Sequence, residues 1–217
     1  MKFFRLNPYF FIVYFIALVA GAIILFAFKK GEILLLINQH HNTFLDQLFY
    51  YGTSMGNGLF YLAVILVLAC IRYRYALLGL VSFSITGILV LLLKNLIFPG
   101  ELRPKIFFEE TQTLHFVDGV KILSYYSFPS GHTAMAFSLF CLLSITIPQK
   151  KYGLVFIVFA LIGGISRIYL AQHFFVDVYF GSLFGVTVTI LCNFYLNKAK
   201  WFHNKPSLEK NLFELFN

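Results

Sequence analysis

A short run in the last third of the chain places three ionisable side chains among apolar ones. Arg167, His173 and Asp177 lie within residues 166–177, where most of the other side chains are hydrophobic. Ionisable groups in such segments are costly and usually functional. His173 and Asp177 are four residues apart, so on a helix they share one face. An aspartate fixes the tautomer of a neighbouring histidine and makes it a better base or nucleophile, so the pair could do chemistry. The alternative is a set of polar anchors at a helix end.

A second polar segment, Pro129-Ser130-Gly131-His132, opens another apolar run. Ser130 is a preferred N-cap residue, and Gly131 lets the backbone approach a ligand closely. The exposed N-terminus of a helix carries unpaired N–H groups that bind anions. The segment is therefore a candidate anion site, and the alternative is an ordinary helix start after a loop.

The composition indicates a polytopic membrane protein. The chain has 217 residues, of which 59% are hydrophobic and only 12% are charged, and a soluble domain of this size could not cover that much apolar surface. Several apolar runs approach or exceed the roughly 18 residues of a membrane-spanning helix. We predict an all-α fold in which residues 1–217 form one domain, a single bundle of six transmembrane helices. The predicted spans are residues 9–28, 58–71, 76–98, 131–148, 153–170 and 174–196.

The segments outside these spans give weaker signals. Residues 29–56 mix apolar and polar positions, which is typical of an amphipathic segment on the membrane surface. Residues 99–128 form the longest polar stretch, which is too short for a second domain. His40 and His41 could bind a metal, but no third ligand is near in the sequence, so solvated loop histidines are favoured. The cysteines lack the spacing of metal ligands or of a disulfide framework, which indicates small buried side chains. They are Cys70, Cys141 and Cys192.

Alternating crossings place most of the basic residues on one side of the membrane. Ten of the 17 Lys and Arg residues fall there, with only Glu209 and Glu214 as acidic residues. The positive-inside rule makes this side cytoplasmic, so the formal charge of +8 indicates membrane anchoring rather than nucleic-acid binding. The ten basic residues are Lys2, Arg5, Arg72, Arg74, Lys150, Lys151, Lys198, Lys200, Lys205 and Lys210.

The opposite side collects the candidate site residues from three regions of the chain. Lys94, Arg103 and Arg167 supply three cations, and the helix start at Ser130 adds backbone donors, which together suit a phosphate group. One histidine with an aspartate partner could attack phosphorus, while the other protonates a leaving oxygen. The sequence offers no carboxylate cluster for Mg²⁺, so we predict phosphoryl chemistry without a metal or another cofactor.

These segments resemble the signature motifs of the type 2 phosphatidic acid phosphatase (PAP2) superfamily. Pro129-Ser130-Gly131-His132 and Ser166-Arg167-x5-His173-x3-Asp177 match two motifs, and Lys94 with Arg103-Pro104 resembles the first one. The resemblance covers about residues 38 to 190. Within it, Asn38, Asp46 and Gly56 are similar to the usual lead-in.

The first motif departs from the family pattern in its spacing. The family commonly has six residues between the lysine and Arg-Pro, whereas this chain has eight between Lys94 and Arg103. Two extra helical residues would move a side chain by about 3 Å and rotate it by roughly 200°. Pro99-Gly100 can absorb the extra residues after Lys94, which keeps Lys94 in the site. The competing interpretation is that Lys105 supplies the cation.

The resemblance implies a role for each site residue. In this family His173 is the nucleophile and forms a phosphohistidine, Asp177 orients it, and His132 protonates the leaving group. The residues that hold the phosphate are Lys94, Arg103, Ser130, Gly131 and Arg167. The related vanadate-dependent haloperoxidases share the pocket but are soluble.

The expected function is a metal-independent lipid phosphatase in the bacterial inner membrane, with its active site facing the periplasm and both termini in the cytoplasm. The expected partners are the bilayer and a lipid phosphate, with no nucleic acid and no metal. Undecaprenyl diphosphate is favoured over phosphatidylglycerol phosphate, phosphatidic acid and the phosphates of lipid A. Two alternatives remain open: a phosphotransferase that uses the same intermediate, and a non-enzymatic carrier of lipids or small anions.

Overall fold

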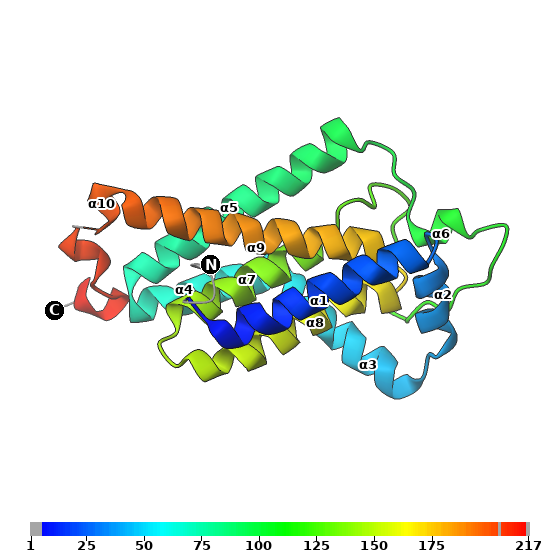
Figure 1. Cartoon of the computed structure of the whole chain (residues 1–217), viewed down its shortest axis with the longest axis horizontal. Coiled ribbons are helices and arrows are strands. Elements are labelled where there is room, and N and C mark those ends of the chain that lie inside the picture. Colours follow the sequence, from blue (N-terminus) through cyan, green and yellow to red (C-terminus); the bar gives the residue numbers. More distant parts are fainter. Residues whose placement is uncertain (1–5, 204, 216–217) are drawn as a thin grey trace.

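The computed structural model describes residues 6–203 and 205–215, and every regular element in these ranges is a helix or a helical turn (Figure 1). The predicted all-α class is confirmed. Six long helices match the six predicted spans to within a few residues at each end. They are α1 (Pro8–Ala27), α4 (Gly58–Ile71), α5 (Tyr73–Leu92), α7 (Gly131–Thr146), α8 (Gly153–Tyr169) and α9 (Phe175–Lys198).

Shorter helices and turns fill the remaining segments. The short helices are α2 (Glu32–Gln39), α3 (Thr43–Gly52), α6 (Pro104–Phe107) and α10 (Lys200–His203). The turns are a π turn at Leu93–Ile97 and 3₁₀ turns at Thr53–Gly56, Lys150–Tyr152, Pro206–Leu208 and Leu212–Leu215.

Length and apolar composition identify fewer membrane spans than the six predicted. Among the described residues, four helical segments are long and apolar enough to cross a membrane, and a fifth is possible if α3 and α4 are one span bent by 58°. The helix α7 is apolar but has only 16 residues. The chain is therefore an all-helical membrane protein. The exact number of six spans and the single domain over residues 1–217 stay predictions.

Side-chain caps fix where several of these helices begin. The Asn7 side chain accepts a hydrogen bond from the backbone N–H of Phe10 at 3.2 Å, and Pro8 follows it at the first helical position. Asn42 and Asn57 cap α3 and α4 in the same way. Because an asparagine or serine oxygen satisfies backbone donors that have no partner inside the helix, these residues set the start of each element.

Small residues let α9 pack closely against α7. A Cβ atom on Gly181 would lie 2.7 Å from the backbone oxygen of Ser130, and one on Gly185 would collide with the backbone of Ala134. Any side chain at these two positions would push the helices apart. This contact holds the start of α7 beside the start of α9.

The segment of residues 29–56 is helical, and its predicted place on the membrane surface stays a prediction. It forms α2, α3 and a 3₁₀ turn, and α2 and α3 both pack against α8. Gly56 lies so close to α7 that a Cβ atom there would collide with the backbone of His132. The mixed polarity of this segment reflects a helix pair that supports the site end of the bundle.

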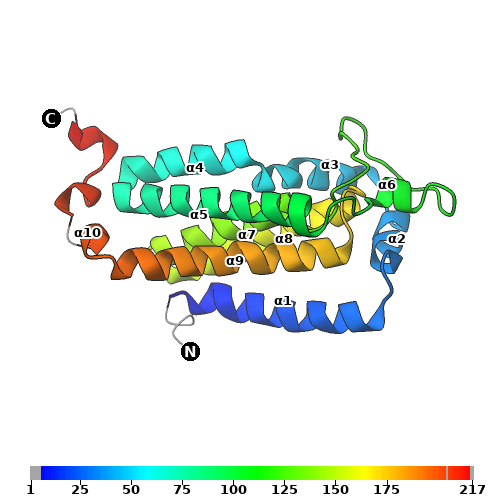
Figure 2. The ribbon, with the colours of Figure 1, turned by 90° about the horizontal axis from the view of Figure 1, so that it is seen from above.

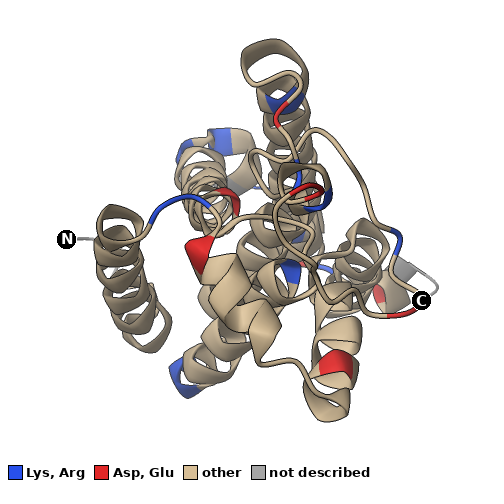
Figure 3. Cartoon of the chain, turned by 90° about the vertical axis from the view of Figure 1, so that its right-hand side faces the viewer, with Lys and Arg blue, Asp and Glu red and all other residues tan. Residues whose placement is uncertain are grey.

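Charge is distributed unequally between the two ends of the bundle. The long loop, residues 98–130, joins the π turn after α5 to α7 and includes α6. Figure 2 shows the chain termini at one end of the bundle and α2 and this loop at the other. The end with the termini holds eight described basic residues and two acidic ones, whereas the other end, seen in Figure 3, holds seven of each. Lys2 and Arg5, which belong to the predicted cytoplasmic set, lie outside the described residues.

Candidate active site

The predicted site residues meet at the end of the bundle that carries the long loop. A cavity of about 510 Å³ is lined there by Lys94, Arg103, Gly131, His132, Arg167 and His173, together with residues 123–126. Asp177 and Ser130 do not line the cavity but lie directly behind it, both buried. The structure thus brings together the residues that the sequence placed in three separate motifs. Lys105, the competing cation, lies on α6 and does not line the cavity.

A tight turn after α8 carries His173 back toward Arg167. The backbone N–H groups of Gln172 and His173 both donate to the carbonyl of Arg167, at 2.9 and 3.0 Å, and Ala171 adopts a left-handed conformation with φ 51°. This is a Schellman-type helix end, in which the left-handed position is usually glycine. An alanine there stores backbone strain, a feature that is common at functional sites. The turn explains the five-residue spacing between Arg167 and His173.

Asp177 holds His173 from the first turn of α9. Asp177 Oδ2 lies 3.2 Å from His173 Nδ1 and also accepts the backbone N–H of Phe174 at 3.0 Å. If Nδ1 carries the proton, it donates to this carboxylate and Nε2 is left with a free lone pair. Nε2 makes no hydrogen bond within the described part of the chain.

The surroundings of His173 favour its neutral form. The residue lies in the turn between α8 and α9, and only 2% of it is exposed. Burial, followed by the positive charges of Arg103, Arg167 and Lys94, holds the pKa of His173 well below its ordinary value of 6.5. A neutral imidazole at pH 7 is what a nucleophile requires.

The start of α7 is tied directly to the start of α9. The Ser130 side chain accepts from the backbone N–H of Thr133, as the N-cap assignment predicts, and its own N–H donates to the carbonyl of Asp177 at 3.0 Å. Gly131 and His132, the first residues of α7, line the cavity, and the backbone N–H groups of a first helical turn have no partner within the helix.

The three cations differ in how many of their donors are already used. Arg103 is held by carbonyl oxygens of Tyr125, Gln172 and Tyr126, so most of its N–H groups are occupied. Lys94 donates to the carbonyls of Tyr126 and Ser127. These bonds leave each residue about one donor for a ligand.

Arg167 is the cation with the most free donors. Its Nη1 atom donates to Thr53 Oγ1 at 2.6 Å, and its Nε atom has no hydrogen-bond partner among the described residues. Because a guanidinium carries five N–H groups, about four of them have no hydrogen-bond partner among the described residues.

Lys94 lies on the π turn that ends α5. A π turn accommodates an extra residue and often occurs at functional sites. The chain then reverses at Gly100, whose φ is 82°. The longer spacing to Arg103 is thus taken up by the π turn together with the predicted break at Pro99-Gly100, and Lys94 stays on the cavity wall.

Several residues of this site carried no signal in the sequence. Ser127 donates a hydrogen bond to Asp177 Oδ2, Gln172 contacts Arg103, and Thr53 holds Arg167. Each is an ordinary polar residue that becomes informative only through its partner far along the chain.

The lead-in residues are also placed around the site. Asn38 pairs with the backbone of His115 at 2.8 Å in both directions. Asp46 accepts from Tyr169 at 2.6 Å and lies 3.0 Å from His115 Nε2. Together they fasten the long loop to α2, α3 and the end of α8. His41 stacks on His115, and within the described residues no group of three or more His, Cys, Asp or Glu side chains could hold a metal ion.

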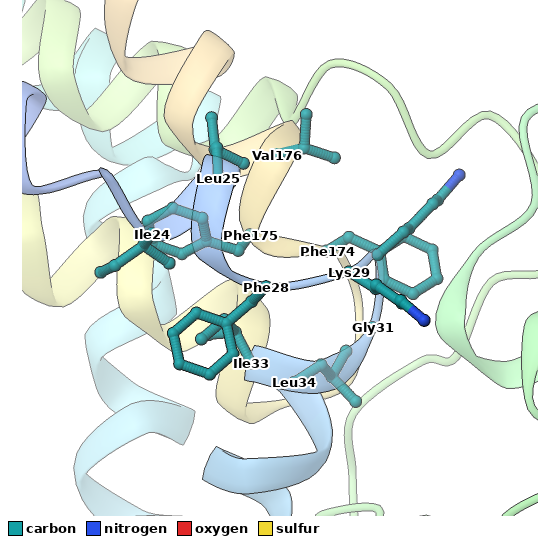
Figure 4. Close-up of a pocket in the computed structure, with 11 residues that line it drawn as sticks. Ile24, Leu25, Phe28, Lys29, Gly31, Ile33, Leu34, Phe174, Phe175 and Val176 are labelled. Carbon is teal, nitrogen blue, oxygen red and sulfur yellow. The ribbon is translucent and has the colours of Figure 1, made fainter. Parts of the chain in front are cut away.

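A second cavity lies apart from this site, between α1, α2 and the start of α9 (Figure 4). It has a volume of about 270 Å³, and its walls are mainly apolar side chains such as Phe28 and Leu34. It shares no lining residue with the cation-lined cavity. Lys30, on its rim, pairs with Glu101 at 3.0 Å and lies 4.9 Å from the ring of Phe174.

Comparisons with solved structures agree with the fold. LpxE from Aquifex aeolicus is 28% identical with a TM-score of 0.69, and the match covers 78% of this chain and 98% of that one. A transmembrane PAP2-type phosphatidylglycerolphosphate phosphatase from Bacillus subtilis is 25% identical with a TM-score of 0.63, and the match covers 93% and 100% of the two chains.

Two curated proteins match shorter stretches. The bacitracin transport permease protein BcrC of Bacillus licheniformis is 38% identical over 82 residues, 38% of this chain. A dihydrosphingosine 1-phosphate phosphatase of Schizosaccharomyces pombe is 43% identical over 89 residues, 36% of this chain. The matched stretches span only 39% and 21% of the lengths of these two relatives.

The family model of the PAP2 superfamily matches residues 73–201. This range contains all eight predicted site residues and extends from α5 to α10. It covers more than half of the chain, and the solved structures share both the fold and a comparable length. The chain therefore belongs to the PAP2 superfamily.

Proposed function

We propose that this protein is a membrane lipid phosphatase that transfers phosphate to His173 and then to water, without a metal. One observation carries the proposal: three cations and two histidines line a single cavity, and no carboxylate lines it. Such a lining matches the charge of a phosphate and the needs of phosphoryl transfer, for which positioning and charge stabilisation supply most of the catalysis.

The first half-reaction forms a covalent intermediate. His173 Nε2 attacks phosphorus, so the N–P bond forms while the bond from phosphorus to the leaving oxygen breaks. His132, which also lines the cavity, gives its proton to that oxygen. Asp177 stabilises the imidazole through Nδ1 as positive charge develops.

The second half-reaction returns the enzyme to its starting state. Water loses a proton to His132 and attacks phosphorus, the N–P bond breaks, and the electron pair returns to His173 Nε2. Lys94, Arg103, Arg167 and the amides of α7 hold the phosphoryl oxygens in both steps.

An apolar groove beside the cavity supports a lipid substrate. A space of about 270 Å³ is lined by Gly87, Met135 and neighbouring apolar residues of α4, α5 and α7, and it shares Lys94, Gly131 and His132 with the cation-lined cavity. A phosphate held among the cations can therefore extend a hydrocarbon chain directly into this groove.

The substrate is proposed by class. Two of the similar proteins are named as phosphatases of phosphatidylglycerolphosphate and of dihydrosphingosine 1-phosphate, which supports a lipid phosphate for this chain. Undecaprenyl diphosphate is our first candidate, followed by phosphatidylglycerol phosphate, phosphatidic acid and the phosphates of lipid A. Transfer of the phosphoryl group to an alcohol would use the same intermediate, whereas a carrier would need neither histidine.

Phosphate release by the purified protein is expected to continue in excess EDTA, because the cavity offers cations and no carboxylates to a phosphate. Orthovanadate is expected to inhibit, since it resembles the trigonal-bipyramidal transition state. The measurement is phosphate released from a panel of lipid phosphates in detergent, with the His173→Ala variant as control. Loss of turnover in EDTA with recovery in Mg²⁺ would refute the mechanism, and binding of the lipids without phosphate release would favour the carrier.

We further propose that the site faces the periplasm of a bacterial inner membrane and that both termini lie in the cytoplasm. The excess of basic residues at the end with the termini supports this orientation. A cysteine at Thr113 is expected to react with an impermeant thiol reagent in spheroplasts, and a cysteine at Gln149 only after lysis. Labelling is measured in a variant without the native cysteines, and the reverse pattern would invert the topology.

A further inference from the structure

Ser127 occupies a buried position between the proposed nucleophile and the cations. The residue is 0% exposed. Its backbone N–H donates to the carbonyl of Glu101 at 3.0 Å, and its own carbonyl accepts from Lys94 at 3.4 Å. Its hydroxyl donates to Asp177 Oδ2 and lies 3.5 Å from His173 Nδ1. Ser127 thus belongs to none of the three motifs but touches two of them.

Three donors converge on one oxygen of Asp177. They are the Ser127 hydroxyl, the backbone N–H of Phe174 and Nδ1 of His173. A hydrogen bond from a neutral donor spreads the charge of a carboxylate and weakens its pull on any other proton that it binds. The Ser127 hydroxyl therefore competes with His173 for the same oxygen.

We propose that Ser127 is a positioning residue that limits the proton affinity of the His173–Asp177 pair and so keeps His173 a good leaving group. The proposal rests on the proposed function, because the leaving group in question is the imidazole of a phosphohistidine. In the hydrolytic step the N–P bond breaks and its electron pair returns to Nε2. A less basic imidazole accepts that pair more readily, so the hydroxyl favours hydrolysis of the intermediate.

The other charged groups around His173 do not act on Asp177 in the way that the Ser127 hydroxyl does. Four groups line the cavity around the imidazole and oppose its protonation. They are Lys94 on the π turn, Arg103 on the long loop, Arg167 on α8 and His132 on α7. Asp177 is the described carboxylate that favours it. Within the described residues, Ser127 supplies the one side-chain hydroxyl that bonds to Asp177. Its hydrogen bond therefore weakens the carboxylate that favours protonation of His173.

The test compares Ser127→Ala with the matched control Ser144→Ala. Ser144 is equally buried, but its hydroxyl bonds to the carbonyl of Cys141, within α7 and away from the cavity. In the pH profile of kcat/KM for the unmodified protein, we expect activity to fall on the acid side only below pH 6.5. Protonated His173 cannot attack phosphorus, and its surroundings lower the pKa of His173. In Ser127→Ala this acid limb is expected to move to higher pH by roughly one unit, the scale of one hydrogen bond to a charged group.

The phosphoenzyme gives a second readout. Ser127→Ala is expected to accumulate several times more labelled intermediate at steady state than Ser144→Ala, because hydrolysis slows more than attack. Ser127→Thr keeps the hydroxyl and is expected to restore both values, while Ser127→Cys, with its weak donor, is expected to fall between. If the alanine variant does not fold, the cysteine variant carries the same comparison.

An unchanged acid limb in Ser127→Ala, or a limb that moves to lower pH, would overturn the proposal even if kcat falls. An unchanged level of intermediate would overturn it as well. If the unmodified protein forms no intermediate at all, the proposed mechanism fails instead, and the pH profile then decides the role of Ser127 by itself.

Discussion

His173→Ala is expected to lower kcat by about 10⁵-fold and to abolish the labelled phosphoenzyme. Losses of this size occur when an enzyme loses a nucleophile that works together with neighbouring catalytic groups. The imidazole is buried, neutral and held by Asp177, so no other described side chain can take its place in the turn after α8. The variant should fold, because the backbone bond from residue 173 to the carbonyl of Arg167 does not depend on the side chain.

The matched control for this substitution is His40→Ala. His40 is an exposed histidine whose Nδ1 lies 2.8 Å from the carbonyl oxygen of Leu36, and it does not line the cavity. Single-turnover kinetics with a labelled lipid phosphate measure both variants. Retention of a labelled intermediate by His173→Ala would assign the nucleophile to another residue.

Arg167→Ala is expected to cost about 10³-fold in kcat/KM, more than the loss for either of the other two cations. One charge-stabilising donor contributes about 10²- to 10³-fold, and Arg167 keeps about four free N–H groups, whereas Lys94 and Arg103 are largely occupied by carbonyls. Lys94→Ala is expected to lose roughly 10²-fold. Arg167→Lys should recover only part of the loss, because an ammonium group cannot form the two parallel hydrogen bonds that a planar guanidinium makes to two phosphate oxygens.

Lys105→Ala is the control for this series, since Lys105 lies on α6 outside the cavity and is expected to lose less than about tenfold. Steady-state kinetics on detergent-solubilised variants of equal thermal stability decide the order. A larger loss for Lys105→Ala than for Lys94→Ala would remove Lys94 from the site, and a loss for Arg167→Ala smaller than that for Lys94→Ala would contradict the assignment of free donors.

Local patterns in the sequence were sufficient for the helices and for the motif residues. Apolar runs located the six long helices, and Ser130 proved to be the N-cap of α7. These features depend on residues within a few positions of each other, where helix geometry and capping chemistry act directly.

The features that local patterns missed depend on contacts between distant segments. Ser127 meets Asp177 across 50 residues, and Asp46 meets Tyr169 across 123. The hydrophobic pattern of the sequence does not predict such pairs, because they form only when the long loop folds onto the ends of the helices. The π turn at Lys94 was also missed, since a π turn has the same composition as the α-helix that it interrupts.

The role of Arg103 is the clearest case in which the structure adds to the motif. Its residue type predicts a phosphate ligand, but its guanidinium holds the carbonyls of Tyr125, Tyr126 and Gln172. The residue therefore positions the wall of the cavity as well as adding charge to it. Sequence alone could not distinguish these uses, because an arginine supplies donors equally well to carbonyl and phosphate oxygens.

The central claim is that phosphate passes through His173, and one measurement tests it directly. The purified protein is mixed with a labelled lipid phosphate in EDTA, quenched within the first turnover at alkaline pH, digested and mapped by mass spectrometry. The account predicts an acid-labile phosphate on the peptide that contains His173, formed before free phosphate appears. Phosphate on any other residue, or free phosphate released in the first turnover with no modified peptide, would contradict it.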